Sequence, residues 1–304
     1  MPTFPDPPLP EDYATMSKRA KRKLYVPVPV NNYTFVFVVS NGHTGTTFLG
    51  RMSDWREHLG PGKKLQPGFS VQHETDPDKG RLVRIPWTTN YCSDGMAYVA
   101  ERKVNKIVHV LRARKQHTWI ESGHQNMLGE LPGLAQMLGK QVRFVRMRRN
   151  RLDVAYSYAQ KGEGPCSPAC IYCLCPLDAI ARCPVDGQTW GMLTLFQQYL
   201  WFVDELECQW QALVHNEPGI VRTDLNWDKS ISGEQLLMVA KFSGMDKAVL
   251  RNETKKETKR DNDHVKSGSR STKNYTAMAA EAHQYRKLLG LKYCDTYSCV
   301  PPLK

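Results

Sequence analysis

Residues 33–49 read YTFVFVVSNGHTGTTFL, and this stretch decides the fold class. Its first eight residues form a nearly continuous β-branched and aromatic run, which is typical of a strand buried on both faces of a parallel sheet. The run leads directly into a turn with two glycines, and apolar residues then recur at helical spacing at Phe48, Leu49, Met52 and Trp55. The stretch therefore predicts a strand, a glycine turn and a helix, in that order.

Strand and helix patterns alternate along the rest of the chain. Strands are predicted over 69–73, 117–121, 141–147 and 219–223, and helices over 94–115, 150–160, 187–214 and 232–243. Because strands that alternate with helices of this length form βαβ units, the sheet should be parallel. The predicted fold class is α/β, with three layers in which helices flank a central parallel sheet.

The composition is that of a basic globular protein. The 304 residues include 42 Lys plus Arg against 30 Asp plus Glu, and 42 − 30 gives a formal charge of +12, which indicates an anionic partner. A hydrophobic content of 41% excludes disorder over most of the chain, and the length excludes a disulfide-stapled miniprotein. Neither an apolar run of roughly 18 residues nor a signal-peptide pattern is present, so we expect a soluble, cytoplasmic chain without a membrane span.

Two basic segments lack a pattern that would bury them. Residues 1–30 are Pro-rich and carry a Lys/Arg run, which predicts a flexible arm rather than a nucleic-acid contact. Residues 251–274 carry eight basic residues against four acidic ones, which predicts a basic loop.

The glycine turn is a candidate phosphate-binding loop. Gly42 and Gly45 leave room for an anion beside the backbone N–H groups at a helix N-terminus, and the hydroxyls of Thr44, Thr46 and Thr47 are further donors. The turn is not a Walker A motif, because Gly45 is followed by threonine and not by lysine. The alternative is a tight strand-to-helix turn with no ligand.

A second turn, after the strand predicted over 141–147, is very basic. Residues 141–158 read QVRFVRMRRNRLDVAYSY, with arginines at Arg143, Arg146, Arg148, Arg149 and Arg151. An arginine at the end of a strand and a serine in the next helix can bind one phosphate together, because the guanidinium binds bidentately and the hydroxyl adds a further bond. Arg149 and Ser157 are the candidates, and a solvated arginine cluster is the alternative.

Both turns resemble motifs of the PAPS-dependent sulfotransferases. Residues 149–157, RNRLDVAYS, are similar to the family's 3′-phosphate-binding stretch, R-N-P-[RK]-D-V-A-V-S. Residues 40–49, SNGHTGTTFL, are similar to its 5′-phosphosulfate loop, P-[KR]-S-G-T-[ST], with Gly45, Thr46 and Thr47 in register. Weaker similarities over 118–126 and 220–245 keep the family's order of elements.

The resemblance implies a P-loop-like sulfotransferase domain over 31–304 that binds PAPS and releases PAP. The residues that it implies for binding the nucleotide are Gly42, His43, Thr44, Gly45, Thr46, Thr47, Arg149 and Ser157. His43 stands where the family has Lys or Arg, and Arg151 stands where it has Pro. His43 can stabilise the leaving phosphate when protonated, or more weakly as a neutral donor. Lys266 or Arg270 in the basic segment is a candidate substitute cation, as a late basic loop is in the family.

Sulfo transfer also needs a base for the acceptor, and three residues are candidates. Glu74 is the first choice and His73 the second, because both follow the strand predicted over 69–73 and should lie at the carboxyl edge of the sheet. Several carbohydrate and tyrosyl-protein sulfotransferases resemble this arrangement. His124, after the strand predicted over 117–121, is the third candidate. The alternative is a solvated acidic loop around Glu74.

A cysteine-rich insertion spans 162–186. Its cysteines are Cys166, Cys170, Cys173, Cys175 and Cys183. In a reducing cytoplasm their spacing favours a structural zinc site, and in the lumen of the secretory pathway it favours disulfides. The two remain alternatives, because the spacing matches no standard zinc finger.

The function predicted is transfer of a sulfo group from PAPS to a hydroxyl or amine of a glycan, a tyrosine or a small metabolite. The alternatives are a nucleotide-binding phosphotransferase, a non-catalytic nucleic-acid-binding protein and an inactive member of the family. Nucleic acid is not the expected partner, and the sequence does not specify the acceptor or the oligomeric state.

Overall fold

β1 (Thr34–Ser40) lies at the centre of a five-stranded sheet in the computed structural model. The strand order is β2-β3-β1-β4-β5, and every neighbouring pair is parallel. The other strands are β2 (Phe69–His73), β3 (Thr118–Ser122), β4 (Val142–Arg148) and β5 (Val221–Asn226). The structure describes residues 30–42, 69–73, 91–123, 127, 130–167, 170, 173–178, 181–226, 233–244 and 274–289.

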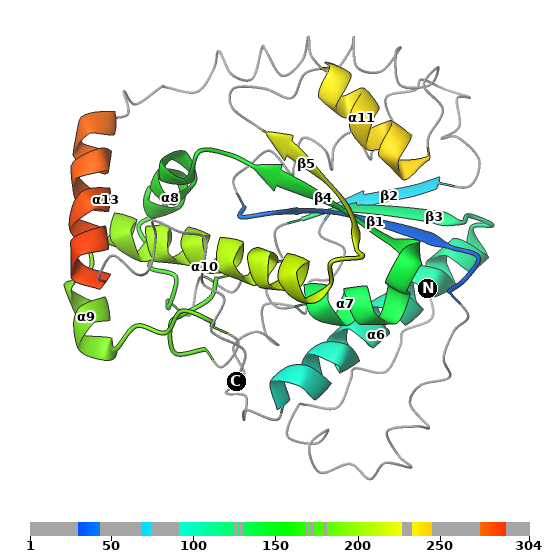
Figure 1. Ribbon diagram of the computed structural model, residues 1–304, viewed down its shortest axis with the longest axis horizontal. Helices are drawn as coiled ribbons and strands as arrows, with labels where there is room; N and C mark the ends of the chain where they lie inside the picture. Colours follow the sequence, from blue (N-terminus) through cyan, green and yellow to red (C-terminus); the bar gives the residue numbers. More distant parts are fainter. Residues whose placement is uncertain are drawn as a thin grey trace.

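Helices cover both faces of the sheet (Figure 1). They are α6 (Tyr91–Ala113), α7 (Leu131–Leu138), α8 (Arg151–Ala159), α9 (Gly187–Met192), α10 (Leu195–Asn216), α11 (Gly233–Ser243) and α13 (Tyr275–Leu289), with a 3₁₀ turn at Gly139–Gln141. α11 lies on the face opposite α6, α7 and α10 (Figure 1). The prediction of an α/β fold with a parallel sheet flanked by helices is therefore confirmed.

The alternation of side chains along the central strands explains the two faces. Phe35 and Phe37 of β1 and Phe144 of β4 belong to the main core with the helices on one side, and Phe144 packs edge-on against Trp210 of α10. Arg143 points the other way, because it donates to the backbone carbonyl of Phe242 in α11 at 2.5 Å. β1 is buried over nearly its whole length, as its unbroken apolar run predicts.

Helix α10 is the central helix of the core. Its consecutive residues 199–203 are all buried, so the helix is covered on every side in its middle turns. The single helix predicted over 187–214 is wrong, because two extended residues at 193–194 separate α9 from α10. The reason is a capping box, in which the Thr194 side chain accepts from the Gln197 backbone and the Gln197 side chain accepts from the Thr194 backbone.

The bounds of β5 and the presence of α7 and α13 also differ from the sequence prediction. β5 begins at Val221 and ends at Asn226, later than the predicted 219–223, because it is a largely exposed edge strand without a burial pattern to mark its ends. The sequence patterns do not predict α7 and α13. In α7 the Pro-Gly pair at 132–133 suggests a loop, although proline is tolerated in the first turn of a helix. The helix predicted after the glycine turn, the arm and the basic loop lie outside the described residues, apart from the ends of these segments at Val30 and Asn274.

The cysteine-rich insertion is tied together by disulfides. Cys166 is bonded to Cys175 and Cys170 to Cys173, which agrees with the disulfide alternative. Cys183 lies outside these two pairs, and its Sγ is 3.5 Å from Sγ of Cys208. Among the described residues, no group of His, Cys, Asp and Glu side chains is arranged to hold a metal ion. No described helix is both long and apolar enough to cross a membrane.

The insertion is attached to α10 through the buried carboxylate of Glu205. Its two oxygens accept from the backbone N–H groups of Arg182 and Cys183, at 2.8 and 2.9 Å. Trp201 adds a third link, because its Nε1 donates to the carbonyl of Cys183 at 2.8 Å. Burial raises the pKa of the Glu205 carboxyl, and the hydrogen bonds from Arg182, Gln209 and Cys183 oppose that rise.

Candidate anion-binding site

The glycine turn and the basic turn leave neighbouring strands at the same edge of the sheet. Ser40, the last residue of β1, lies opposite Met147, and β4 ends one residue later. After β1 the chain continues to β2, which is one edge strand of the sheet, and after β4 it continues to β5, which is the opposite edge strand. Open α/β sheets bind their ligands at such a switch point, outside the carboxyl ends of the strands.

Asn41 fixes the start of the glycine turn. Its Nδ2 donates to the carbonyl of Val203 in α10 at 3.2 Å, and its Oδ1 accepts from Nη2 of Arg146 in β4. The side chain thus joins β1, β4 and α10 at one point. Ser40 adds a local bond, because its Oγ accepts from the backbone N–H of Gly42 at 3.1 Å.

Gly42 is required by its conformation and by its neighbour. Its φ is +78°, a region that residues with a Cβ adopt only under strain. A Cβ at this position would lie 1.8 Å from Oη of Tyr158 in α8. The Tyr158 ring is stacked on that of Tyr199 with centroids 5.0 Å apart and meets Phe202 edge-on, so it is held in place. The glycine turn therefore begins in close contact with the helix that carries the second motif.

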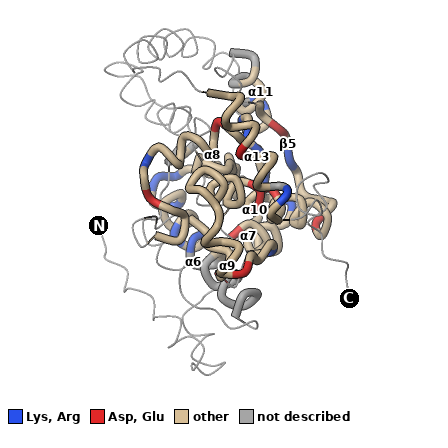
Figure 2. Tube along the Cα trace, turned by 90° about the vertical axis from the view of Figure 1, so that its left-hand side faces the viewer, with Lys and Arg blue, Asp and Glu red and all other residues tan. Residues whose placement is uncertain are grey.

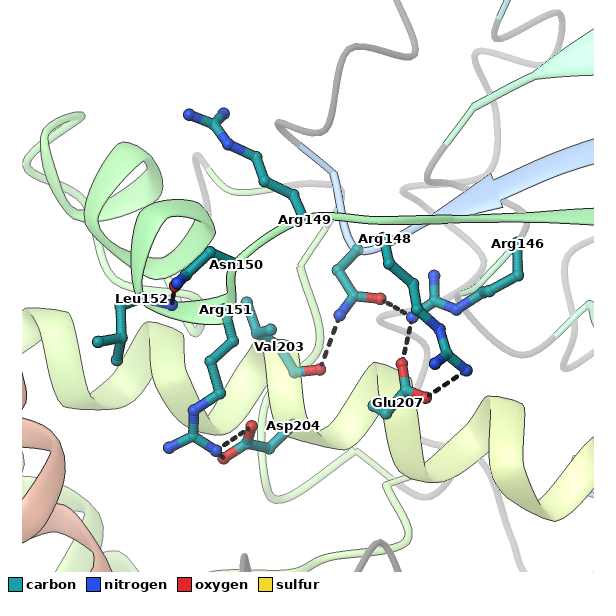
Figure 3. A pocket seen from close by; sticks show the side chains of 10 residues that line it. Arg146, Arg148, Arg149, Asn150, Arg151, Leu152, Val203, Asp204 and Glu207 are labelled. Atoms are coloured by element: carbon teal, nitrogen blue, oxygen red, sulfur yellow. Dashed lines mark hydrogen bonds and ion pairs between the residues drawn. The ribbon is translucent and has the colours of Figure 1, made fainter. Parts of the chain in front are cut away.

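A cavity of about 330 Å³ lies between these turns and α10 (Figure 3). It is lined by Asn41 directly after β1, by Arg146, Arg148, Arg149, Asn150, Arg151 and Leu152 from the end of β4 to the start of α8, and by Val203, Asp204 and Glu207 of α10. The lining residues include four arginines and two carboxylates, so their formal charge is +2. The cavity therefore has the size and the charge to take an anionic group.

Arg146 and Glu207 form a buried ion pair at the base of the cavity. Nη2 of Arg146 lies 2.5 Å from Oε2 of Glu207, and the two side chains are 1% and 12% exposed. Burial lowers the pKa of Arg146, and the charge of Glu207 opposes that shift. Burial would raise the pKa of Glu207, but the charge and hydrogen bond of Arg146 outweigh it, so the net pKa is lowered. Through this contact Arg146 ties β4 to α10 beside the cavity.

Two other arginines are paired at the cavity wall. Nη1 of Arg151 contacts both carboxylate oxygens of Asp204, at 2.9 and 3.1 Å. Arg148 is more exposed, and it lies 3.6 Å from Glu207 and 3.3 Å from Asp224 of β5. In Figure 3 the Arg151 side chain points to α10, on the same side as Arg146 and Arg148.

Arg149 points away from this group (Figure 3). Its Nε lies 4.0 Å from Oδ2 of Asp153, and its side chain is 24% exposed. Asn150 begins α8 as its N-cap, because its Oδ1 accepts from the backbone of Leu152 and, at a longer distance, of Asp153. The asparagine of the RN motif therefore starts α8 directly after Arg149.

Ser157 lies on the same helix, four residues after Asp153. Residues four apart lie on one face of a helix, so Asp153 and Ser157 share a face of α8. Ser157 is partly buried. Asp153 therefore stands between Arg149 and Ser157 along the second motif. A carboxylate thus separates the two residues that are predicted to bind phosphate.

The structure describes only some of the predicted site residues. Gly42, Arg149 and Ser157 are described, and the first two lie at adjacent turns of the sheet edge. His73 is the last residue of β2, which is separated from β1 by β3, about 10 Å across the sheet. The remaining candidates lie outside the described residues, namely His43, Thr44, Gly45, Thr46, Thr47, Glu74, His124, Lys266 and Arg270.

Several residues of the site were not predicted from the sequence. Asp204 and Glu207 belong to a helix identified only by its apolar pattern, yet their spacing of three places both on one face. This acidic pair on a helix rich in aromatic residues is the signal that marks them as partners of the arginines. No comparable signal distinguishes Asn41, whose role depends on contacts with residues 105 and 162 positions away.

The chain was also compared with known proteins. No protein-family model, no curated protein and no solved structure matches it. The function must therefore be argued from the residues and their arrangement.

Proposed function

We propose that this chain is a PAPS-dependent sulfotransferase with a P-loop-like fold. The observation that carries the proposal is the parallel pairing of β1 with β4, with Ser40 opposite Met147. The pairing brings together two sequence motifs that are about 100 residues apart and that resemble the two phosphate-binding stretches of one family. The turns flank the switch point of the sheet, where a nucleotide is expected in an open α/β fold.

The residues of the site fit the charges of this nucleotide. In the proposal, the backbone of the turn from Gly42 to Thr47 binds the 5′-phosphosulfate, and Arg149 and Ser157 bind the 3′-phosphate. The close approach of Gly42 to Tyr158, which leaves no room for a Cβ, agrees with a turn whose backbone is held in a fixed conformation. Arg146, paired with Glu207, is a supporting residue and not a phosphate ligand.

The chemistry requires two further groups in the proposal. Glu74 is the first candidate for the base that removes the proton of the acceptor hydroxyl or amine, followed by His73 and His124. His43, with Lys266 or Arg270, stabilises the charge that develops on the leaving phosphate. The acceptor proposed is a glycan, a tyrosine or a small metabolite.

The paired state of the arginines favours a small anion over nucleic acid. A nucleic-acid surface depends on cations that reach phosphates at the surface. Here Arg146 is buried, and Arg151 contacts both oxygens of Asp204. The absence of a lysine after Gly45 disfavours a phosphotransferase of the Walker type.

The test is a comparison of PAP with 5′-AMP by thermal shift and calorimetry. These ligands differ by the 3′-phosphate that Arg149 is proposed to bind. We expect PAP at 100 times its Kd to stabilise the chain by about 2.7 kcal/mol and AMP to stabilise it much less. Arg149→Ala should remove the preference for PAP.

The matched control is Arg222→Ala, which removes an exposed arginine near the opposite end of the sheet. It should leave PAP binding unchanged. A response to Mg-ATP but not to PAP would support the phosphotransferase instead. Salt-sensitive oligonucleotide binding without a response to PAP would support the nucleic-acid-binding alternative. PAP binding without sulfo transfer to any acceptor would indicate an inactive member of the family.

A further inference from the structure

Helix α13 contacts two of the carboxylates that pair with arginines of the basic turn. Tyr275, its first residue, donates from Oη to Oδ1 of Asp153 at 2.8 Å. Tyr285 donates to Oδ2 of Asp204 at 3.3 Å. α13 packs against α8 and α10, beside which it lies in Figure 2. The two tyrosines thus reach the two carboxylates from one helix.

The hydrogen bonds of Tyr275 and Tyr285 differ in how much they fix the position of the carboxylate that accepts them. Asp204 is already held by Arg151 at 2.9 and 3.1 Å, so the longer bond from Tyr285 adds little to its position. Asp153 is 4.0 Å from Arg149, and the 2.8 Å bond from Tyr275 is the shorter of these two contacts. Tyr275 therefore holds one oxygen of Asp153 so that the other oxygen faces Arg149.

Asp153 is also a carboxylate on the helix face that carries Ser157. A phosphate bound by Arg149 and Ser157 would lie near this negative charge, and like charges repel. A hydroxyl that donates to the carboxylate draws part of its charge away from the anion. The bond from Tyr275 therefore orients Arg149 and reduces the repulsion between Asp153 and the ligand.

We propose that Tyr275 is a positioning residue for the 3′-phosphate, acting through Asp153 on Arg149. This role rests on the proposed function, because it specifies how the second phosphate of the same site is bound. It goes beyond that function by assigning part of the nucleotide specificity to α13, which belongs to neither sequence motif. Tyr275 itself is 51% exposed, so its substitution does not disturb the core.

The experiment measures PAP and AMP affinity in Tyr275→Phe. Loss of a hydrogen bond to a charged group should weaken PAP binding by about tenfold and leave AMP binding unchanged. A general loss of folding would lower the affinity for both ligands. Tyr285→Phe is the matched control, since it removes the same hydroxyl from the same helix, and we expect a change of less than about twofold because Arg151 keeps Asp204 in place.

A double-mutant cycle tests the route through Asp153. If Tyr275 acts through Asp153, Tyr275→Phe should have no further effect on PAP affinity in an Asp153→Ala background. A full additional loss in that background would overturn the route. The hydrogen bond and charge of Asp153 raise the pKa of Tyr275 above its usual 10.0. Asp153→Asn should therefore lower that pKa, as measured by NMR titration of the labelled tyrosine ring without nucleotide.

The outcomes separate the two proposals. If the wild-type chain binds no PAP, the proposed function fails and this role fails with it. If the wild-type chain prefers PAP over AMP and Tyr275→Phe keeps the full preference, only the role of Tyr275 is wrong. An unchanged pKa of Tyr275 in Asp153→Asn would likewise overturn the coupling between Tyr275 and Asp153, regardless of the measured nucleotide affinities.

Discussion

Substitution of Gly42 by alanine tests the contact from which the glycine turn begins. Two costs follow from the structure. The backbone at φ +78° is unfavourable for alanine by about 1–2 kcal/mol. The new Cβ would lie 1.8 Å from Oη and 2.8 Å from Cζ of Tyr158, and such overpacking costs about 1–3 kcal/mol. Gly42→Ala should therefore reduce the free energy of unfolding by about 2–5 kcal/mol.

Gly162→Ala separates these two costs. Gly162 has the same φ of +78°, and a Cβ there would meet no atom within 4 Å. Its substitution should cost only the backbone term of about 1–2 kcal/mol. The difference between the two variants in guanidinium unfolding therefore measures the contact with Tyr158. Tyr158→Phe in the Gly42→Ala background should restore part of the loss, because it removes Oη but leaves Cζ close.

If Gly42→Ala and Gly162→Ala lose the same stability within about 0.5 kcal/mol, the contact between the glycine turn and α8 does not exist as described. The same conclusion follows if Tyr158→Phe restores nothing. Either result would also remove one of the links between the two motifs.

Three further predictions concern the remaining parts of the site and the insertion. Glu207→Ala should cost about 3–5 kcal/mol in chemical unfolding, because it leaves the charge of Arg146 buried without its charged partner, whereas an exposed control such as Glu163→Ala should cost little. The folded pKa of Glu207 is below its ordinary 4.5, so its stabilisation is present above pH 4.5 and lost as the pH falls through the folded value. Glu207→Gln should lack this part of the acid dependence, and an identical acid dependence in wild type and variant would contradict the assignment. Glu74→Gln should reduce kcat about 100-fold or more with unchanged PAP affinity, and near-normal turnover would transfer the role of base to His73 or His124. Cys166→Ser should lower stability by about 2.5 kcal/mol under oxidising conditions, because the bond to Cys175 closes a short loop. Bound zinc by elemental analysis, with loss of stability on chelation, would instead support the metal alternative.

The arrangement of the sheet was largely predictable from local pattern. The run at 35–39 is apolar throughout, and this composition predicts both a strand and its burial at the centre of the sheet. β2, β3 and β4 follow their predicted ranges within one residue. The break between α9 and α10 was missed because the apolar pattern continues across it, although Thr194 and Gln197 are the signature of a helix start.

The partners of the arginines were not predictable in the same way. The sequence identifies the basic turn, but whether an arginine binds a ligand or a carboxylate depends on which helix packs over it. Arg146 and Arg149 are three residues apart, yet the first is buried against Glu207 and the second points away from it. Arg146 lies within β4 next to α10, whereas Arg149 follows the last residue of β4, and the position of α10 is not encoded in the motif itself. The contact of Tyr275 with Asp153 spans 122 residues and has no local signal.

The junction at Asn41 has a consequence for how tightly a ligand can be bound. Its side chain is bonded to a strand and to a 22-residue helix before any ligand arrives, so the first residues of the glycine turn are already in one conformation. Binding to a preorganised segment loses less conformational entropy than binding to one that must be ordered at the same time. For this part of the turn, that entropy is lost once, when the chain folds, and the affinity of an anion is correspondingly higher.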